Sequence, residues 1–257
     1  MIDFEYHAPT SLDEVFELLD QYGDDARIMA GGTALVIQMK QRLSQPGHVI
    51  GLRQMGSLNS IESTPEGLSI GALCTQRQIE NNNLVGENLP LLADTFRKVA
   101  TPRIRNMATI GGGLVNGDPN QDPPPALIAL GASAVMTSKS GGRVVPLEEL
   151  FIDYYETDVR PGEVMTSVLV PPAPAGSGSV YLKFLPRTAD DYGTVSVAVV
   201  VSKEQDGTCK DIHIALGSAG VTPIRAKDAE DALRGKPLTD ENIRAAAALV
   251  KDAVDPL

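Results

Sequence analysis

Apolar positions near the start of the chain alternate between helical spacing and short runs. A helix over residues 11–22 is predicted by the apolar positions Leu12, Val15, Phe16, Leu19 and Tyr22, which fall on one helical face. Ser11, with Glu14 three residues later, matches a capping box. Residues 27–30 and 49–52 predict short strands, and residues 34–40 between them predict a helix. We therefore expect residues up to about Leu52 to form a small α/β lobe.

A second set of elements follows between residues 57 and 172. Residues 68–72 and 166–170 alternate like strands, and residues 75–82 and 89–100 have helical spacing. Three prolines at 123–125 are expected to break the chain before a short helix at 126–130. Two β-rich runs, 134–137 and 143–146, flank Ser140-Gly141-Gly142 and predict a hairpin.

The clearest linker is the Pro- and Gly-rich stretch over residues 171–178, and we expect a domain boundary there. Beyond it, residues 180–185, 195–201 and 212–216 predict three strands, and residues 226–233 and 240–250 predict two helices. Strands followed by helices indicate an α+β domain over residues 178–257. Lys183 alternates with Val180, Leu182 and Phe184, so it should point to the opposite face of its strand, where a solvated lysine is the simplest interpretation.

Composition narrows the class of protein. The 257 residues are 42% hydrophobic, enough for one large domain or two smaller ones. The formal net charge of -11 argues against nucleic acid or an anionic membrane as a partner, because these select a basic face. Only Cys74 and Cys209 are present, so we expect no disulfide framework, no cysteine-held metal and a reducing cytoplasm. The chain starts with acidic residues and has no long apolar run, so we expect it to be neither exported through a signal peptide nor inserted in a membrane.

Two glycine runs carry the candidate chemistry. Gly31-Gly32-Thr33 follows a predicted strand and precedes a predicted helix, and Gly111-Gly112-Gly113 recurs 80 residues later. Glycine lets backbone N–H groups approach an anion, so two such turns could converge on the two phosphates of a dinucleotide. The alternative is a pair of tight turns that need glycine only for their geometry.

Competing motifs fail on spacing. A Rossmann fingerprint needs a preceding strand and an acidic residue about 20 positions on, and the second glycine run has neither. A calcium loop starting at Asp118 would need glycine at its sixth position, where Pro123 stands, and glutamate at its twelfth, where Ala129 stands. The three histidines are scattered along the sequence, and no hydrolase motif is present.

Several of these motifs occur together in the order known from one family. Residues 28–33, residues 105–112, the Asp118-Pro119-x-x-Asp122-Pro123 motif, residues 161–165, the Lys183-Phe184-x-x-Arg187 motif and Asp191-Tyr192 resemble the FAD-binding medium subunits of molybdenum hydroxylases. These belong to xanthine, carbon monoxide and nicotinate dehydrogenase-type complexes. The resemblance covers nearly the whole chain. It implies a two-subdomain FAD domain of the PCMH/vanillyl-alcohol-oxidase type over residues 1–172, divided at about 56, and a C-terminal flavoprotein domain.

The resemblance also implies the site. Two loops, residues 30–35 and 109–113, would hold the FAD diphosphate through backbone donors. Asp122 would bond ribose or ribityl hydroxyls, Met165 would pack near the flavin ring, Lys183 would meet its polar edge and Tyr192 would cover one face. The predicted cofactor-binding residues are Arg27, Ile28, Met29, Ala30, Gly31, Gly32, Thr33, Ala34, Leu35, Ala100, Thr109, Ile110, Gly111, Gly112, Gly113, Asp118, Asp122, Met165, Lys183 and Tyr192. No catalytic side chain and no metal ligand is expected.

The chain departs from the family pattern in three places. Relatives commonly have Asn or Asp where this chain has Gly113, so one hydrogen bond to the cofactor is expected to be absent. They usually extend past the position of Leu257 with a further helix, which makes the C-terminal domain shorter here. The cysteine-rich insertion that carries an extra iron–sulfur cluster in 4-hydroxybenzoyl-CoA reductase is also lacking.

By this resemblance the chain is an oxidoreductase subunit that passes electrons through FAD to an external acceptor. Its expected partners are a molybdopterin-binding large subunit and a small subunit with 2Fe-2S clusters, assembled as a dimer of heterotrimers. Two alternatives stay open: a self-sufficient FAD-dependent oxidoreductase, and a scaffold whose flavin site has decayed. Recognition of the organic substrate would lie in another subunit, and the sequence motifs do not specify the terminal electron acceptor.

Overall fold

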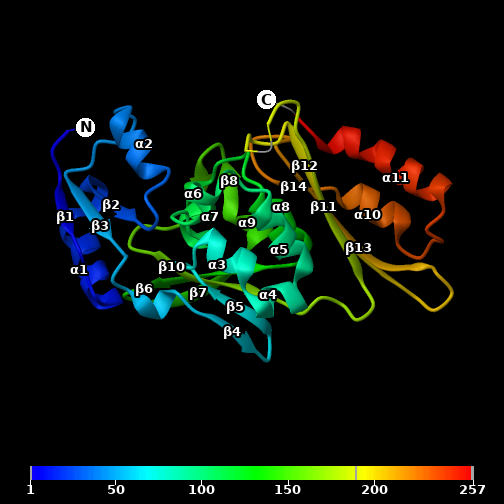
Figure 1. Ribbon diagram of the computed structural model, residues 1–257, viewed down its shortest axis with the longest axis horizontal. Helices are drawn as coiled ribbons and strands as arrows, with labels where there is room; N and C mark the ends of the chain where they lie inside the picture. The colour runs from blue at the N-terminus through cyan, green and yellow to red at the C-terminus, as the bar shows by residue number, and fades with distance from the viewer. Residues whose placement is uncertain (1, 189, 256–257) are drawn as a thin grey trace.

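The computed structural model describes residues 2–188 and 190–255. Along its longest axis, the N-terminal lobe lies at one end and the C-terminal helices lie at the other (Figure 1). A central part with a five-stranded sheet and several short helices lies between them (Figure 1). The two-domain, mixed helix and strand fold expected from the sequence is confirmed.

The N-terminal lobe is a parallel three-stranded sheet with order β1-β3-β2. Its elements are β1 (Glu5–His7), α1 (Leu12–Tyr22), the 3-10 turn Gly23–Asp25, β2 (Ala26–Met29), α2 (Leu35–Lys40) and β3 (His48–Gly51). All predicted elements are present within one or two residues, and β1 was missed because three residues cannot display an alternation. The hydroxyl of Ser11 caps α1, accepting from the Glu14 amide. The Glu14 carboxylate, however, accepts from the Thr10 amide and not from Ser11, so the capping box is incomplete.

The central part contains an antiparallel sheet with order β4-β5-β10-β6-β7. Its strands are β4 (Ile61–Thr64), β5 (Gly67–Gly71), β6 (Ser133–Ser138), β7 (Gly141–Pro146) and β10 (Val164–Val170), with a separate ribbon of β8 (Phe151–Asp153) and β9 (Glu156–Thr157). The helices are α3 (Gln76–Asn81), α4 (Asn83–Asn88), α5 (Pro90–Arg97), α6 (Pro102–Arg105), α7 (Ile110–Asn116), α8 (Pro123–Ala129) and α9 (Leu147–Leu150), and Gly56–Leu58 is a 3-10 turn. The β6–β7 hairpin lies where its turn residues predicted it.

Two predictions for this part were wrong. The glycine run was expected to be a turn, but Gly111, Gly112 and Gly113 lie inside helix α7, which Thr109 caps. The prolines at 123–125 were expected to break the chain, but they form the first turn of α8. Proline is accepted there because the first-turn N–H groups of a helix have no intrahelical acceptor and proline has no N–H to satisfy.

The C-terminal part is an antiparallel sheet with two helices. It contains β11 (Gly178–Phe184), β12 (Val195–Lys203), β13 (Cys209–Gly217), β14 (Ile224–Arg225), α10 (Lys227–Leu233) and α11 (Asp240–Ala253). The sheet therefore has four strands instead of the three predicted. The fourth, β14, has only two residues, and so short a strand leaves no periodicity to detect.

One core joins the central and C-terminal parts. The buried cluster includes Ile70 of β5, Leu127 of α8, and Tyr181 and Ala198 of the C-terminal sheet. A smaller cluster fills the N-terminal lobe, and a third lies between the C-terminal sheet and α10–α11. Within residues 2–188 and 190–255, we find no helix long and apolar enough to cross a membrane.

The side chains of strand β11 alternate between two faces as predicted, but the face with the apolar residues is exposed and the face with Lys183 is buried. The Lys183 side chain is only 2% exposed, whereas Leu182 and Phe184 are 59% and 61% exposed. The solvated-lysine interpretation is therefore wrong. The buried Lys183 side chain lies at the candidate site.

Candidate functional site

The two glycine runs predicted to converge are in direct contact. A Cβ on Gly31 would overlap the carbonyl oxygen of Met107, and a Cβ on Gly112 would lie 3.3 Å from the Cβ of Ala30. Helices α2 and α7 are also joined, because the Gln38 side-chain amide donates to the Asn116 side-chain oxygen at 3.4 Å. Only residues without a side chain allow this approach of one backbone to another.

The first loop leaves a row of unused backbone donors. Within residues 2–188 and 190–255, no acceptor bonds to the amides of Gly31, Gly32, Thr33, Ala34 and Leu35. Gly32 has φ +74°, a left-handed conformation that side chains disfavour, and its Cβ would lie 3.2 Å from the Met29 sulfur. The last two of these amides belong to the start of α2, where the first N–H groups of a helix have no intrahelical acceptor. A row of unpaired amides of this kind is one that anions such as phosphates can accept from.

The second run contributes in a different way. The amides of Ile110 and Gly111 donate to the carbonyls of Cys74 and Ala72 at 3.0 and 2.9 Å. The Gly112 amide donates to the Thr109 hydroxyl at 3.1 Å, and the Gly113 amide donates to the Thr109 carbonyl. These four donors are therefore already used within the chain. Gly111 packs against Ala72 and Gly112 against Ala30, so the run serves close packing at the start of α7, and the free donors lie in the first loop.

Asp118 is buried and faces two tyrosines. The Tyr192 hydroxyl donates to its carboxylate at 3.1 Å, although the Tyr192 residue as a whole is 62% exposed. Desolvation of the hydroxyl and the nearby Asp118 charge raise the pKa of Tyr192 and raise the pKa of Tyr155 to about 12. Both phenols are therefore neutral donors at physiological pH. Tyr192 presents an exposed aromatic ring whose hydroxyl is held in place, which suits stacking on a planar ligand.

Asp122 lies in a second, deeper polar cluster. Its carboxylate accepts from the Tyr181 hydroxyl at 2.6 Å and from the Lys183 ammonium at 2.9 Å. Burial raises the pKa of Asp122, and the hydrogen bonds from Tyr181 and Lys183 oppose that shift. Lys183 also donates to the carbonyl of Lys98, which ties β11 to the end of α5. This cluster connects the C-terminal sheet to the central part.

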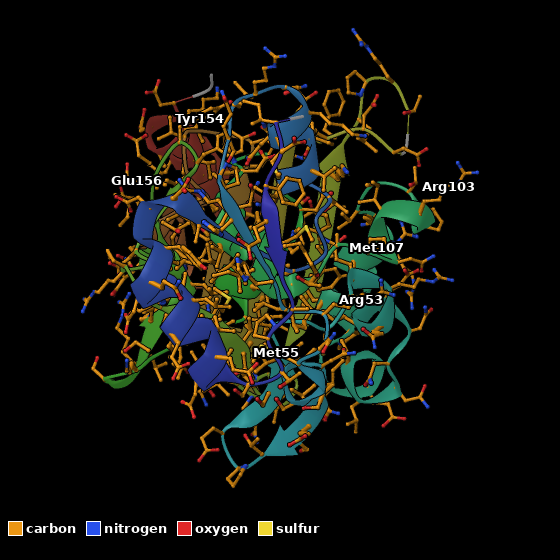
Figure 2. The ribbon with its side chains drawn as sticks, turned by 90° about the vertical axis from the view of Figure 1, so that its left-hand side faces the viewer. Arg53, Met55, Arg103, Met107, Tyr154 and Glu156 are labelled. Atoms are coloured by element: carbon orange, nitrogen blue, oxygen red, sulfur yellow. The ribbon has the colours of Figure 1, made fainter. Side chains whose placement is uncertain are left out.

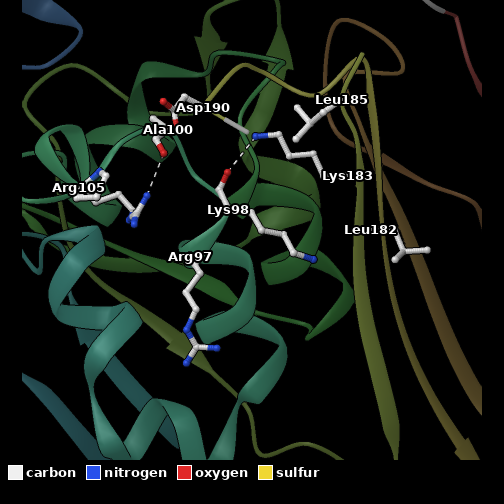
Figure 3. Close-up of a pocket in the computed structure, with 9 residues that line it drawn as sticks. Arg97, Lys98, Ala100, Arg105, Leu182, Lys183, Leu185 and Asp190 are labelled. Atoms are coloured by element: carbon white, nitrogen blue, oxygen red, sulfur yellow. Dashed lines mark hydrogen bonds between the residues drawn. The ribbon is translucent and has the colours of Figure 1, made fainter. Parts of the chain in front are cut away.

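A cavity of about 440 Å³ lies next to this cluster. Figure 3 shows that α5 and α6 form one wall and that β11 forms the other. Its wall includes the predicted residues Ala100 and Lys183. Ala100 has φ +38°, and its carbonyl accepts from Arg105, drawn as a dashed line in Figure 3. Its charged lining residues are Arg97, Lys98, Arg105, Lys183 and Asp190. Three of the four cations are ion-paired with carboxylates outside the lining: Arg97 with Asp94, Arg105 with Glu80 and Lys183 with Asp122.

Two predicted residues lie elsewhere in the structure. Met165 is 4% exposed and packs in the main core, opposite Met136 at a bulge of β10. The Arg27 guanidinium donates to the carbonyls of Asp24 and Ala26, next to its own strand. Their proposed contacts with a cofactor stay predictions.

Four residues that the sequence did not single out support the site. Tyr181 and Lys98 complete the Asp122 cluster, Tyr155 adds to the Asp118 cluster, and Gln121 donates to the carbonyl of Gly113 at 2.8 Å. No motif marks these residues, because long-range pairing alone brings them in. Viewed from the N-terminal lobe, the exposed side chains of Met107 and Tyr154 lie on either side of that lobe (Figure 2).

Comparison with known proteins gives consistent matches. Residues 2–173 match the family described as the FAD binding domain in molybdopterin dehydrogenase, and residues 180–257 match the CO dehydrogenase flavoprotein C-terminal domain. The carbon monoxide dehydrogenase medium chain of Afipia carboxidovorans is 36% identical over 98% of this chain and 88% of that relative. The glyceraldehyde dehydrogenase medium chain of Sulfolobus acidocaldarius is 34% identical over 99% of this chain and 89% of its own length. A solved carbon monoxide dehydrogenase structure from Hydrogenophaga pseudoflava superposes with a TM-score of 0.96 at 39% identity, covering 100% of this chain and 90% of that one.

Proposed function

Since the chain belongs to the family of FAD-binding medium subunits of molybdenum hydroxylases, such as carbon monoxide dehydrogenase, we propose that it passes electrons from a partner subunit to an external acceptor. Its cofactor is FAD, and the molybdenum and iron–sulfur cofactors of such enzymes reside in other subunits. The chain is a subunit of an oxidoreductase.

The observation that carries this proposal is the row of free amides at residues 31–35, beside the glycine contact with residues 107–112. In our proposal the first loop donates to the FAD diphosphate, and its close contact with residues 107–112 holds that loop in place. Neutral backbone dipoles would hold the phosphates, which reconciles an anionic cofactor with a chain of net charge -11. Residues 27–30, Ala100, Met165 and Asp118 would line the remainder of the site.

The polar clusters would orient the flavin. Tyr192 would cover one face of the ring, Asp122 would bond hydroxyls of the cofactor, and Lys183 would face the polar edge. The short bonds among Asp122, Tyr181 and Lys183 support a pre-organised arrangement, because each side chain is held before any ligand binds. Bound FAD would supply the ability to exchange electrons singly or in pairs, and the chain supplies binding and orientation.

We propose that the partners are a molybdopterin-binding large subunit and a small subunit with 2Fe-2S clusters, in a dimer of heterotrimers. Relatives described as medium chains and FAD-binding subunits support membership of a complex with several subunits. We further propose a cytoplasmic location, an FAD domain over residues 1–172 with subdomains meeting near residue 56, and a C-terminal domain over residues 178–257. The strand-free linker between Val170 and Gly178 supports this division.

A self-sufficient flavoenzyme would need its own acid or base, and the described residues do not favour one. Cys74 and Cys209 are buried, and burial raises the pKa of the Cys74 thiol to about 11, so it is a protonated core side chain. His213 lies in the C-terminal sheet, and its ring nitrogen Nδ1 is hydrogen-bonded to the carbonyl of Ala129 in α8. A lone purified chain that oxidises an organic substrate would overturn our preference for the heteromeric complex.

Flavin binding tests the cofactor site directly. We expect the purified chain to carry, or take up, one FAD per chain with flavin absorbance, and Gly31→Ala to lose it because the new methyl group overlaps the Met107 carbonyl. Gly86→Ala is the matched control, because nothing lies within 4 Å of a Cβ at that helical position. Equal FAD content in wild type and Gly31→Ala would refute the assignment of the first loop.

Native purification tests the assembly. Under our proposal the chain co-purifies in a one-to-one ratio with a molybdenum-containing subunit and an iron–sulfur subunit. Recovery of the yellow chain alone from its native source, with full activity toward an organic substrate, would contradict the proposed electron route.

A further inference from the structure

Two of the three histidines, which the sequence placed far apart, meet in the N-terminal lobe. Strands β1 and β3 are parallel neighbours, with Glu5 opposite His48 in the register. His7 lies two residues after Glu5 and therefore on the same face of the sheet. All three side chains share that face, and their ligand atoms lie within 4.8 Å of one another. Residues 7 and 48, far apart in the sequence, are thus neighbours in space.

The distances match those between ligands of one metal ion. His7 Nε2 lies 3.0 Å from His48 Nδ1. The Glu5 carboxylate oxygens lie 4.0 Å from the first of these nitrogens and 3.7 Å from the second. Tetrahedral zinc with bonds of about 2.05 Å would place its ligand atoms about 3.3 Å apart. The two carboxylate distances are too long for hydrogen bonds. They also exceed the spacing expected around zinc, so the Glu5 side chain, which is 64% exposed, would rotate toward the ion on binding.

From this arrangement we propose that Glu5, His7 and His48 bind a divalent transition metal ion of the zinc type. Two imidazole nitrogens and one carboxylate oxygen are ligands that suit zinc. The His7 and His48 side chains are 14% and 19% exposed, so a solvent path to the ion remains. Three protein ligands leave a fourth position for water.

The neighbouring aromatic ring supports a fixed geometry. Tyr22, the last residue of α1, stacks on His48 with ring centroids 3.6 Å apart and an interplanar angle of 16°. This contact fixes the plane of the His48 ring, as the surroundings of metal-binding histidines commonly do. Without a cation, the two facing ring nitrogens can only share one proton.

The position of the cluster indicates a structural role. His48 is the first residue of β3, whereas the loop with the free amides follows the last residue of β2. Glu5 and His48 therefore lie at the opposite end of the sheet from the glycine loop, and His7 lies on β1, which β3 separates from β2. A bound ion would fasten the three-residue strand β1 to β3, without contact to the proposed FAD site.

Cobalt binding tests the proposal with a spectroscopic signal. The untagged full-length chain, freed of metal by a chelator, should bind one Co²⁺ with the intense visible absorbance of four-coordinate cobalt, and Zn²⁺ should displace it. We expect His7→Asn and His48→Asn each to weaken binding at least about 100-fold, the upper end of the loss caused by removing a supporting group. His213→Asn is the matched control and should bind as the wild type does.

FAD content separates this outcome from the proposed function. All three histidine variants should keep wild-type flavin absorbance, which also shows that they fold. Substoichiometric Co²⁺, a weak octahedral spectrum, or equal binding by His7→Asn and wild type would each overturn the metal site, whatever the result of the FAD experiments.

Discussion

The ion pair between Asp122 and Lys183 is the most enclosed charge pair among the described residues, with side chains 5% and 2% exposed. Asp122→Asn should lower the free energy of unfolding by about 3–5 kcal/mol, because it leaves the Lys183 ammonium buried without its counter-ion. Urea denaturation measures this loss. Lys139→Ala, which removes a pair with both partners mostly exposed, serves as the control and should leave the midpoint unchanged. Equal midpoints for Asp122→Asn and wild type would show that this cluster is not a structural connection.

Glu163 gives the protein a defined acid sensitivity. Its carboxylate accepts two hydrogen bonds of 2.7 Å from Arg143, which hold the pKa of Glu163 below its ordinary value of 4.5. A lowered carboxylate pKa stabilises the fold above the unfolded-state pKa, and this stabilisation is lost as the pH falls through the folded-state pKa.

The variant Glu163→Gln should therefore have a lower melting temperature than wild type at pH 7, and the gap should close as the pH falls below about 4.5. Thermal melts of both proteins between pH 7 and pH 3 measure the gap. A gap that stays constant over this range would rule out the proposed effect of Arg143.

At the scale of elements, the stability of helix α7 depends on its N-cap, Thr109. The Thr109 hydroxyl accepts from the Gly112 amide, and three glycines in seven residues weaken the helix itself. Thr109→Ala should cost about 1 kcal/mol in urea denaturation, and Thr109→Ser, which keeps the hydroxyl, should recover most of it. Loss of equal size in both variants would indicate that packing of the methyl group, and not the cap, stabilises α7.

The elements that the sequence predicted well are those with a local signal. The helix α1 has an apolar stripe and a cap at Ser11, and the β6–β7 hairpin has its turn residues. Tertiary contacts decided the exceptions. The glycines of α7 are helical because the amides of Ile110 and Gly111 bond to Cys74 and Ala72, which lie more than 30 residues earlier. No window of neighbouring residues contains that information.

At the scale of the whole molecule, the sequence predicted those parts of the candidate site that consist of glycine-rich loops. Gly31 and Gly112 converge as expected. The side chains that complete the clusters, such as Tyr155 and Tyr181, were missed, because positive φ and burial depend on distant segments. The inward direction of Lys183 was missed for the same reason: the exposed face of β11 is the apolar one.

Cofactor binding should stabilise the chain as a whole. A ligand that binds only the folded state adds about 2.7 kcal/mol at a concentration 100 times its dissociation constant. We therefore expect the melting temperature of the wild type to rise steadily with added FAD, and that of Gly31→Ala to stay constant. Differential scanning fluorimetry detected through intrinsic tyrosine emission follows both, and a matching rise in the variant would place FAD away from the first loop.

The contact between Gly31 and Met107 also orders events during synthesis. The loop that offers the free amides is translated early, but the backbone against which it rests follows 76 residues later. A nascent chain that has released only its first hundred residues holds half of the proposed FAD site, with no opposing backbone. Under our proposal, flavin is captured only after the residues up to Asn116, nearly half of the chain, have left the ribosome, so cofactor loading reports on the folding of the N-terminal lobe together with α7.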